Sequence, residues 1–455
     1  MAVENRRKLN LLRPSWSQLL ARVKQTPEIG VALALTVIVI IAMLTITAKP
    51  MYSTPREHLG GEYFQLARAL VEGRGYSDPF AERTGPTAWM PPLYSTVMAF
   101  IMLFTDSRTV VSFVVVGLTG LTIVAMGTTV YGILRRCQTW IPPVFGAALS
   151  VAWVIVLDYW FLVITTDVWI LCLLWVFAAI LIFRAVWANT MNSWAWGVLG
   201  GVAALASPAQ AFAIGMMFAG LAFNQRLQPK RWLIAAGLAA AITAPWVVRN
   251  AVVFGTFIPT KSNLYYEFYT ANIYDDDGVY DGPQMAKHPY VALDARFRYA
   301  RFGEQKYLEG HRRVFLRDGF KKPDDLLRRV QNRALAATVV YPALTEGGDG
   351  GHTLLMRRVF YAAPWVVFLA SIWISGRHRR LLAWCGLACG VFLLPYVLIA
   401  FYARYSMPLA PMYILVTCLG LDQLAHRLFA KQRVTSENSS ENSSEAVSEA
   451  EAMAQ

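Results

Sequence analysis

Long apolar runs separated by short polar connections dominate the chain. Runs of about 17–25 apolar residues are long enough to cross a bilayer core of roughly 30 Å as helices. Two of the runs are shorter and flank Pro208, and we count each as a crossing. The candidate membrane-spanning segments are 29–48, 109–134, 141–157, 168–187, 194–206, 209–223, 232–248, 359–375, 381–400 and 407–424.

A further apolar run, 93–105, is shorter than a crossing normally needs. Lys and Arg concentrate on the cytoplasmic side of membrane proteins, so the charges decide whether this run crosses. If it crossed and the two short runs formed one span, Arg135, Arg136 and Arg184 would lie outside. If it does not cross, the basic span ends face the cytoplasm and the short outer turns hold almost no basic residue except Arg404. We therefore predict ten crossings, both termini in the cytoplasm, and a re-entrant or interfacial 93–105.

The predicted fold is an all-α polytopic membrane protein with about ten transmembrane helices, juxtamembrane helices on the outer face and one long extracytoplasmic loop. The stretch 293–335, rich in Arg, Lys and aromatic residues, predicts amphipathic helices packed over the membrane face. We expect the cell inner (plasma) membrane as the location. The expected segments are a cytoplasmic N-terminus (1–28), an N-terminal transmembrane module with the first outer loop at 49–108 (29–248), an extracytoplasmic loop region (249–358), C-terminal transmembrane helices (359–425) and a cytoplasmic, disordered tail (426–455).

Composition and charge exclude two broad classes. With 56% apolar and only 16% charged residues over 455 positions, the chain is too apolar for a soluble protein. The formal charge of +13 comes from span ends and one long polar segment, so we expect no nucleic-acid partner. The five cysteines lie in or beside spans, which argues against a disulfide framework.

Known nucleotide, zinc and serine-hydrolase motifs are absent from the sequence. We therefore expect no nucleotide or prosthetic group, assign no metal ligands, and leave open whether a divalent metal takes part. The triplet Asp275-Asp276-Asp277 could hold Ca²⁺ or Mg²⁺, but no ligand spacing of a known site follows it, and a solvated turn is favoured.

After the first span, around Glu62, the sequence contains polar and charged residues in a pattern that a lipid-facing helix does not need. Tyr63, Leu66, Ala69 and Leu70 form one apolar stripe if this stretch is helical, which predicts a helix on the outer leaflet. A carboxylate held at the boundary between membrane and water has the proton affinity of a general base. The alternative is a solvated acid favoured by the helix dipole at the helix N-terminus.

Two further acids flank an outer turn between spans, Asp158 and Asp167. Acids at membrane depth are costly and suggest function. The alternative is that both mark the water boundary, with Asp167 capping the helix that follows it.

Arginines stand at the outer ends of two spans, Arg249 followed by Asn250, and Arg404. Such an arginine can snorkel to lipid phosphates in general, or it can grip one phosphate bidentately. For Arg404 the second interpretation is favoured, because it is the only basic residue in its turn.

Four stretches of the chain resemble the GT-C superfamily of polytopic glycosyltransferases, in the bacterial branch of the protein O-mannosyltransferase and lipid A aminoarabinose transferase group. Together with the spans they cover nearly all of 29–425. The stretches are Glu62-x4-Ala67 through Gly73-x-Gly75-Tyr76-Ser77-Asp78-Pro79-Phe80, Gly85-Pro86-Thr87-Ala88-Trp89-x-Pro91-Pro92-Leu93-Tyr94, Pro245-Trp246-x2-Arg249-Asn250-x3-Phe254-Gly255-x5-Lys261-Ser262-Asn263, and Arg404-Tyr405-x2-Pro408.

The resemblance implies a sugar donor linked to a polyprenyl phosphate, and transfer on the outer face with inversion at the anomeric carbon. It also implies an acid in the first outer loop as base, a position that falls on Glu62. Many relatives carry an acidic pair just before the tyrosine, where this chain has Leu59-Gly60-Gly61, so Asp167 or Glu57 stays open as the base. Arg404 matches the arginine expected at the donor phosphate.

We therefore expect an inverting glycosyltransferase that moves a sugar from a polyprenyl-phosphate donor to an extracytoplasmic acceptor hydroxyl on a glycan, lipid or protein. The alternatives are a catalytically inactive binding relative, or a lipid or solute transporter, although no paired inverted repeats with broken helices are evident. The expected partners are membrane lipids, this donor and the acceptor. The expected catalytic residues are Glu62 and Asp167, and the expected substrate-binding residues are Arg404, Arg249, Asn250, Tyr63, Trp89, Asn263 and Glu267.

Overall fold

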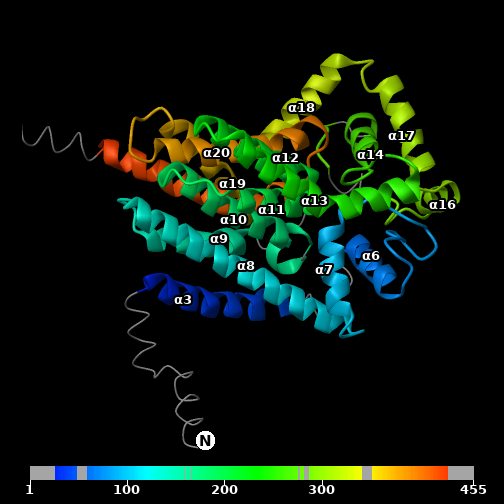
Figure 1. Cartoon of the computed structure of the whole chain (residues 1–455), viewed down its shortest axis with the longest axis horizontal. Helices are drawn as coiled ribbons and strands as arrows, with labels where there is room; N and C mark the ends of the chain where they lie inside the picture. The colour runs from blue at the N-terminus through cyan, green and yellow to red at the C-terminus, as the bar shows by residue number, and fades with distance from the viewer. Residues whose placement is uncertain are drawn as a thin grey trace, which may run out of the picture.

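The computed structural model is a bundle of long helices that carries a group of shorter helices at one end (Figure 1). It describes residues 26–48, 59–157, 159–164, 166–274, 277–280, 286–340 and 351–428. Within these ranges no β-strand forms, and only two isolated bridges occur, Ser77 with Pro86 and Val279 with Phe401. The residues considered above that lie outside the described ranges are Glu57, Asp158, Asp275, Asp276 and the two terminal segments, 1–25 and 429–455.

Seven helices in the described residues are long and apolar enough to cross a membrane, so the chain is a multi-pass membrane protein. Three further helices of the bundle, α9, α11 and α12, are shorter. The long ones are α3 (Pro27–Ala42) with its π-helical end η1 (Met43–Thr47), α8 (Arg108–Cys137), α10 (Val168–Trp187), α13 (Pro229–Phe254), α19 (Gly351–Ser371), α20 (Arg379–Leu398) and the span Ala403–Leu428 with its 3₁₀ turns η4 (Ala403–Tyr405) and η5 (Met407–Leu409); the shorter ones are α9 (Pro143–Val156), α11 (Ser193–Ala206) and α12 (Pro208–Asn224), and the π-helical turn η2 (Tyr159–Val163) follows α9.

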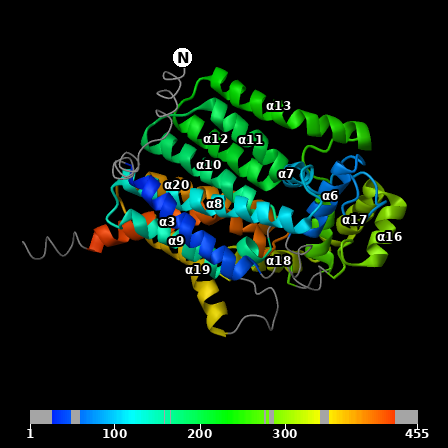
Figure 2. The same cartoon turned by 90° about the horizontal axis from the view of Figure 1, so that it is seen from below.

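The last span and α10 form the centre of the bundle. Met412, Tyr413, Ile414 and Leu415 follow one another and are all buried, so this helix is surrounded by protein on every side. Helix α10 contacts α8, α11, α12 and α20, and its Trp175 is fully buried. By contrast, α3 lies at one margin of the bundle (Figure 1) and α13 at another (Figure 2), and both expose apolar side chains along most of their length. Exposed apolar helices of this length face lipid in a membrane protein.

The break between α11 and α12 follows from two adjacent residues. Pro208 has no N–H to continue the α11 hydrogen-bond pattern, and it begins α12, where its fixed φ is compatible with the first turn. Ser207 is extended and its hydroxyl accepts a hydrogen bond from the Gln210 N–H at 3.4 Å. This junction matters for the site, because it forms part of a cavity wall.

The shorter helices gather at one end of the bundle, on the right of Figure 1. Helix α6 packs on α7, and α14 packs on α17. The end group comprises α6 (Gly61–Val71), α7 (Pro92–Met102), α14 (Leu264–Tyr269) with its π-helical turn η3 (Thr270–Tyr274), α16 (Leu293–Phe302), α17 (Glu304–Asp318) and α18 (Pro323–Thr338).

Arg333 fastens the end group to the bundle. Its side chain is fully buried and donates to the carbonyl of Val397 at 2.8 Å and to Asn272 Oδ1 at 3.1 Å. The first bond reaches α20 and the second reaches the residues after α14, so one guanidinium joins three segments. A buried cation is stable only when its donors are satisfied, as they are here.

The expected helices of the two polar segments are present. Helix α6 begins one residue before Glu62, and the amphipathic helices expected over 293–335 appear as α16, α17 and α18. The apolar run 93–105 forms α7, whose eleven residues extend over about 17 Å, roughly half of a bilayer core. Its length therefore agrees with a segment that does not cross. The division into five segments remains a prediction.

Candidate active site

Helix α6 carries Glu62 in its first turn. Gly60 precedes the helix with a φ of 69°, a left-handed conformation that an L side chain rarely adopts. At Gly61 an added Cβ would lie 1.8 Å from the Tyr290 hydroxyl oxygen, so only glycine leaves room for this close approach. The two glycines therefore set the start of α6 and let the segment around His288 and Tyr290 close over Glu62.

Glu62 is largely withdrawn from water. Its Oε1 lies 3.6 Å from Nε2 of His288, and only 17% of its side chain is exposed. Burial raises the pKa of Glu62 to about 7, aided by the charges of Glu267 and Asp167 and opposed by those of Arg404 and Lys261. A carboxyl group with this pKa exchanges its proton near neutral pH, as a general base requires.

The tautomer of His288 follows from its two neighbours. Its Nδ1 accepts a hydrogen bond from the Tyr290 N–H at 3.3 Å. Burial, followed by the charge of Arg404, lowers the pKa of His288 to about 3, so the ring is neutral. The single ring proton then sits on Nε2 and faces the Glu62 carboxylate. His288 can therefore orient Glu62 but is too weak a base to take a proton itself.

Arg404 enters the site from the 3₁₀ turn η4, at the start of the last span. Its guanidinium lies over the rings of Tyr402 and Tyr405, with its central carbon 5.8 and 5.6 Å from their centroids. The Tyr405 ring stacks in turn on Tyr396 of α20, 4.4 Å away. Among the described residues, no carboxylate lies within 4.0 Å of this guanidinium. Arg404 is thus held by aromatic rings and leaves its charge available to an anion.

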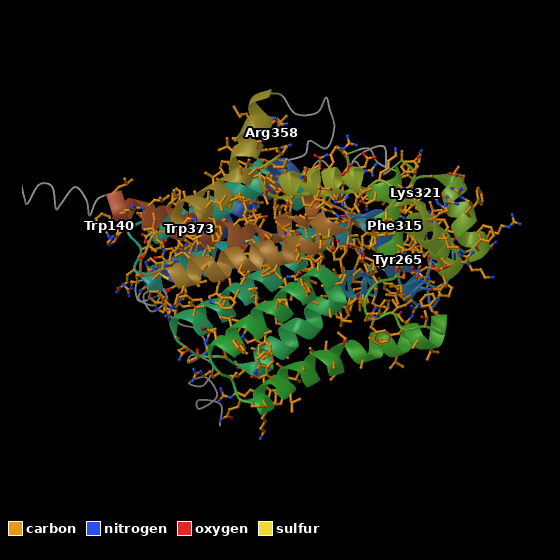
Figure 3. The ribbon with its side chains drawn as sticks, turned by 90° about the horizontal axis from the view of Figure 1, so that it is seen from above. Trp140, Tyr265, Phe315, Lys321, Arg358 and Trp373 are labelled. Carbon is orange, nitrogen blue, oxygen red and sulfur yellow. The ribbon has the colours of Figure 1, made fainter. Side chains whose placement is uncertain are left out.

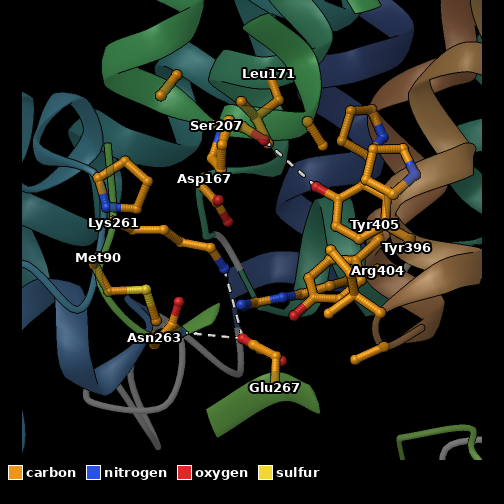
Figure 4. Close-up of a pocket in the computed structure, with 18 of the residues that line it drawn as sticks. Met90, Asp167, Leu171, Ser207, Lys261, Asn263, Glu267, Tyr396, Arg404 and Tyr405 are labelled. Carbon is orange, nitrogen blue, oxygen red and sulfur yellow. Dashed lines mark hydrogen bonds and ion pairs between the residues drawn. The ribbon is translucent and has the colours of Figure 1, made fainter. Parts of the chain in front are cut away.

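A second cation, Lys261, faces the same space. Its Nζ lies 3.6 Å from Oε1 of Glu267, and the same oxygen accepts a hydrogen bond from Asn263 at 3.1 Å. In Figure 4 the side chains of Lys261 and Arg404 lie close together beside Glu267. The side chain of Asp167, which directly precedes α10, points into the same pocket. Three carboxyl groups (Glu62, Asp167, Glu267) thus share the site with two cations.

Two adjoining cavities meet at these side chains. One, of about 220 Å³, lies between α10, the α11–α12 junction and the end of α20, and its walls are mainly apolar. The other, of about 310 Å³, lies between α6, α14 and the segment around His288, and contains Glu62. The residues that line both are Tyr63, Met90, Asn263, Glu267, Arg404 and Tyr405. One cavity therefore opens among the membrane helices and the other under the end group.

The wall between the cavities depends on Glu304, a buried acid of α17. Its carboxylate accepts hydrogen bonds from the Ala88 N–H at 2.9 Å, from the Ser262 hydroxyl at 2.7 Å and from Tyr299 at 2.7 Å, and it also bonds the Thr87 hydroxyl. These bonds hold the residues directly before Trp89 and Asn263, and both Trp89 and Asn263 line the larger cavity.

Most of the residues expected from the sequence come together. Glu62 and Trp89 line the larger cavity, Asp167 the smaller one, and Tyr63, Asn263, Glu267 and Arg404 line both. Burial and the charge of Asp167 raise the pKa of Tyr63 well above its usual range, so Tyr63 is a neutral hydroxyl beside that acid.

Arg249 and Asn250 lie elsewhere. Arg249 donates to the carbonyls of Tyr76 at 2.6 Å and Thr87 at 2.7 Å, and the Asn250 amide donates to the carbonyl of Ile258 at 3.0 Å. Neither residue lines the two cavities. The Arg249 contacts hold the loop between α6 and α7 against α13, and the Asn250 contact holds the segment that follows α13. Their expected role in substrate binding stays a prediction.

Sequence analysis did not assign Lys261, His288, Tyr396 or Tyr405 to the site. Lys261 stood within a stretch that carried the family resemblance, so a signal for it existed. His288 had none, because only folding brings it beside Glu62. Within the described residues, no group of three or more His, Cys, Asp or Glu side chains gathers as a metal-ligand set.

Fold and site together define a polytopic helical membrane protein in which a buried acid, Glu62, and a cation, Arg404, share one cavity system. No family model and no curated protein matches the sequence. Two solved structures do match: ArnT from Cupriavidus metallidurans bound to undecaprenyl phosphate (16% identity, TM-score 0.38, covering 85% of this chain and 77% of that chain) and its apo state (15%, 0.36, 88% and 78%). ArnT is a lipid A aminoarabinose transferase, from the group that the sequence resembles. At these TM-scores the likeness carries no functional argument, and function is argued from the site.

Proposed function

We propose that this protein is an inverting glycosyltransferase that moves a sugar from a polyprenyl-phosphate donor to an acceptor hydroxyl. The observation that carries the proposal is the placement of Glu62 and Arg404 in the wall of one cavity. A displacement at an anomeric carbon needs a base for the incoming hydroxyl and a cation for the departing phosphate. The cavity system supplies one of each.

The smaller cavity is suited to the donor lipid. Its walls come from α10, α12 and α20 and are apolar except where Asp167, Lys261, Asn263, Glu267 and Arg404 converge. An isoprenoid chain can lie among the apolar helices while its phosphate reaches the two cations. This arrangement suits a substrate that arrives from the bilayer, and it extends the family resemblance to particular side chains.

The reaction is a single displacement. The acceptor oxygen attacks the anomeric carbon from the Glu62 side while its proton passes to the Glu62 carboxylate. The bond between the anomeric carbon and the phosphate oxygen breaks, and its electron pair leaves with the polyprenyl phosphate. Arg404 and Lys261 stabilise that growing negative charge. Attack opposite to the leaving group inverts the anomeric centre.

In this proposal Glu62 is the base and Asp167 is a second acid that lies beside Tyr63 and the cations. Glu62 is preferred because it lines the larger cavity, where an acceptor from the aqueous side would enter, and because burial brings its pKa to about 7. Nε2 of His288 faces Oε1 of Glu62 at 3.6 Å, beyond hydrogen-bond distance, and no described residue hydrogen-bonds this oxygen, so it remains free to accept a proton.

The orientation belongs to the proposal as well. At the end of the bundle away from Glu62, short connections and helix ends carry Arg135, Arg136, Arg379 and Arg427. Basic residues in short loops mark the cytoplasmic side, which supports the inner membrane, cytoplasmic termini and an extracytoplasmic site. A reporter fused near Asp325 in α18 should be active on the periplasmic side. A cytoplasmic signal there would place the site on the wrong face for this reaction.

The decisive experiment compares Glu62→Gln with the intact protein in liposomes that contain undecaprenyl-phosphate-linked sugars and an envelope extract as the acceptor source. Release of undecaprenyl phosphate should fall roughly 100- to 10,000-fold in the variant, the usual contribution of a general base. The matched control is Glu82→Gln, which removes an exposed glutamate 60% open to solvent and should be silent. Turnover that is unchanged in Glu62→Gln would remove this residue from the mechanism.

A further inference from the structure

A separate cavity lies at the other end of the bundle. It has a volume of about 560 Å³ and is formed by the α8–α9 connection, the α19–α20 turn and the end of the last helix. Figure 3 shows Trp140 and Trp373, two residues of its rim, at the end opposite to Tyr265 and Lys321 of the end group. Helix α20 runs from this cavity to the candidate active site, and its twenty residues span about 30 Å.

We propose that this cavity binds the phosphate of an anionic lipid headgroup on the membrane face opposite to the candidate active site. The proposal does not depend on the catalytic assignment. It rests on the charge of the lining, on a buried ring nitrogen without a hydrogen-bond partner among the described residues, and on the exposed tryptophans at the rim of the cavity.

The cavity lining carries a net positive charge, because its two arginines outnumber its one acid and that acid already has partners. Arg377 and Arg427 both line the cavity, and the one acid among its described lining residues is Asp422. Asp422 is already engaged, because its Oδ1 accepts from the backbone N–H groups of Trp140 and Ile141 and its Oδ2 lies 3.4 Å from Nε2 of His378.

The two arginines are only lightly held. Arg377 donates one hydrogen bond, at 3.2 Å to Gln138, and lies over the Trp187 ring. Arg427 makes no hydrogen bond or ion pair with other described residues. Two guanidinium groups in this state can both turn toward a phosphate.

His378 adds a buried ring nitrogen, Nδ1, that has no hydrogen-bond partner among the described residues. Only 5% of the residue is exposed, its ring stacks on Trp187 at 5.7 Å, and its Nδ1 makes no hydrogen bond. Its other nitrogen faces Asp422. An anion in the cavity would favour a proton on Nδ1, so that one nitrogen donates to Asp422 and the other to the anion.

A lipid is favoured over a free anion because of the surroundings. Trp140 is 55% and Trp373 80% exposed, and exposed tryptophans of this kind mark the interface between bilayer and water. Exposed apolar side chains, Val144 on α9 and Leu369 on α19, stand a few residues from them toward the membrane core. Basic pockets between the ends of transmembrane helices suit phosphate headgroups whose chains remain in the bilayer.

The test is native mass spectrometry of the full chain in detergent, titrated with phosphatidylglycerol, phosphatidylcholine and inorganic phosphate. We expect phosphatidylglycerol to bind more tightly than phosphatidylcholine, and millimolar inorganic phosphate not to displace it. Displacement by inorganic phosphate, or equal binding of the two lipids, would overturn a lipid-headgroup site.

The variant pair is Arg377→Gln with Arg427→Gln, and the matched control is Arg226→Gln with Arg231→Gln, two exposed arginines outside the cavity. The first pair should weaken phosphatidylglycerol binding about tenfold and the control pair should not. Phosphatidylglycerol should also raise the melting midpoint of the intact protein but not of the first pair, which separates lost binding from lost folding. Equal effects of both pairs would show a diffuse surface attraction and overturn the proposal.

Discussion

Nε2 of His288 lies 3.6 Å from Oε1 of Glu62, and the backbone N–H of Tyr290 occupies the other nitrogen of the same ring. The imidazole therefore presents its Nε2 toward the carboxylate. At this separation the contact is not a hydrogen bond, and Oε1 of Glu62 has no hydrogen-bond partner among the described residues, so this oxygen stays available to a proton of the substrate. The pair joins a helix after the first span to a loop far along the chain, and it determines how the candidate base is presented.

The activity should depend on pH through Glu62. Because burial raises its pKa to about 7, the proton-accepting form is the minor one at pH 6 and the major one at pH 8. The rate should therefore rise with pH through about 7 and level off above it. The measurement is kcat/KM for donor turnover from pH 5.5 to 9, and a rate that is flat across this range would contradict the assignment.

The same shift predicts a change in stability. The pKa of Glu62 is higher in the folded protein than its usual 4.5, so the native state binds this proton more tightly and stability falls as pH rises through 4.5 to about 7. The shift corresponds to on the order of 3 kcal/mol above pH 7. Glu62→Gln should thus melt higher than the intact protein at pH 8 but not at pH 4.5. Equal melting differences at both pH values would show that Glu62 titrates normally.

His288 should act on Glu62 without touching the substrate. His288→Phe removes the donor, so ionised Glu62 is less stabilised and the pH–rate profile should move upward. His288→Gln keeps a donor and should restore most of the profile. The comparison of the two profiles is the measurement, because a purely structural role would lower the rate in both variants without moving the midpoint.

Arg404 should contribute through its charge and its shape. Arg404→Gln should lower kcat/KM for the polyprenyl-phosphate donor about 100-fold or more, since the departing phosphate loses its cation. Arg404→Lys should recover part of this loss, because a lysine keeps the charge but lacks the planar fork. The neutral variant should also move the pH–rate profile upward, since Arg404 lowers the pKa of Glu62. A normal donor KM and kcat in Arg404→Gln would exclude it from donor binding.

Arg249 should behave as a scaffold residue. Arg249→Gln removes the donors to the carbonyls of Tyr76 and Thr87, which should cost about 2–4 kcal/mol of stability. Folded protein should be less abundant and melt lower, while the donor KM of the folded fraction should stay near that of the intact protein. The control is Arg231→Gln, an exposed arginine. A raised donor KM with normal melting would instead restore Arg249 to substrate binding.

Much of the helical architecture follows from the sequence because it depends on local properties. Apolar run length alone marked the spans that became α8, α10 and α20, and the change to an amphipathic pattern marked α6. Pro208 marked the break between α11 and α12, since a proline has no N–H for the preceding helix. Seven of the site residues expected from short sequence stretches also line the cavities, since each was recognised from its neighbours in the sequence.

The distinction between Arg249 and Arg404 was not accessible in this way. Both arginines end or begin a span next to aromatic residues, and their sequence surroundings are alike. Their roles separate because the carbonyls of Tyr76 and Thr87, from the loop after α6, accept hydrogen bonds from Arg249, whereas Arg404 lies in the cavity wall beside Glu62. A hydrogen bond to a carbonyl of a distant segment has no counterpart in the residue pattern around the arginine, so the sequence alone does not reveal it.

By itself, the sequence determined that the chain is helical, crosses the membrane repeatedly and carries a carboxylate on a short helix after its first span, since hydropathy and helix periodicity act over neighbouring residues. Only the tertiary structure decided that His288 faces Glu62, that Lys261 and Arg404 meet above Glu267, and that Glu62 is dry enough to hold its proton near neutral pH. Desolvation and charge coupling depend on everything that surrounds a group in space, and folding supplies those surroundings from all parts of the chain.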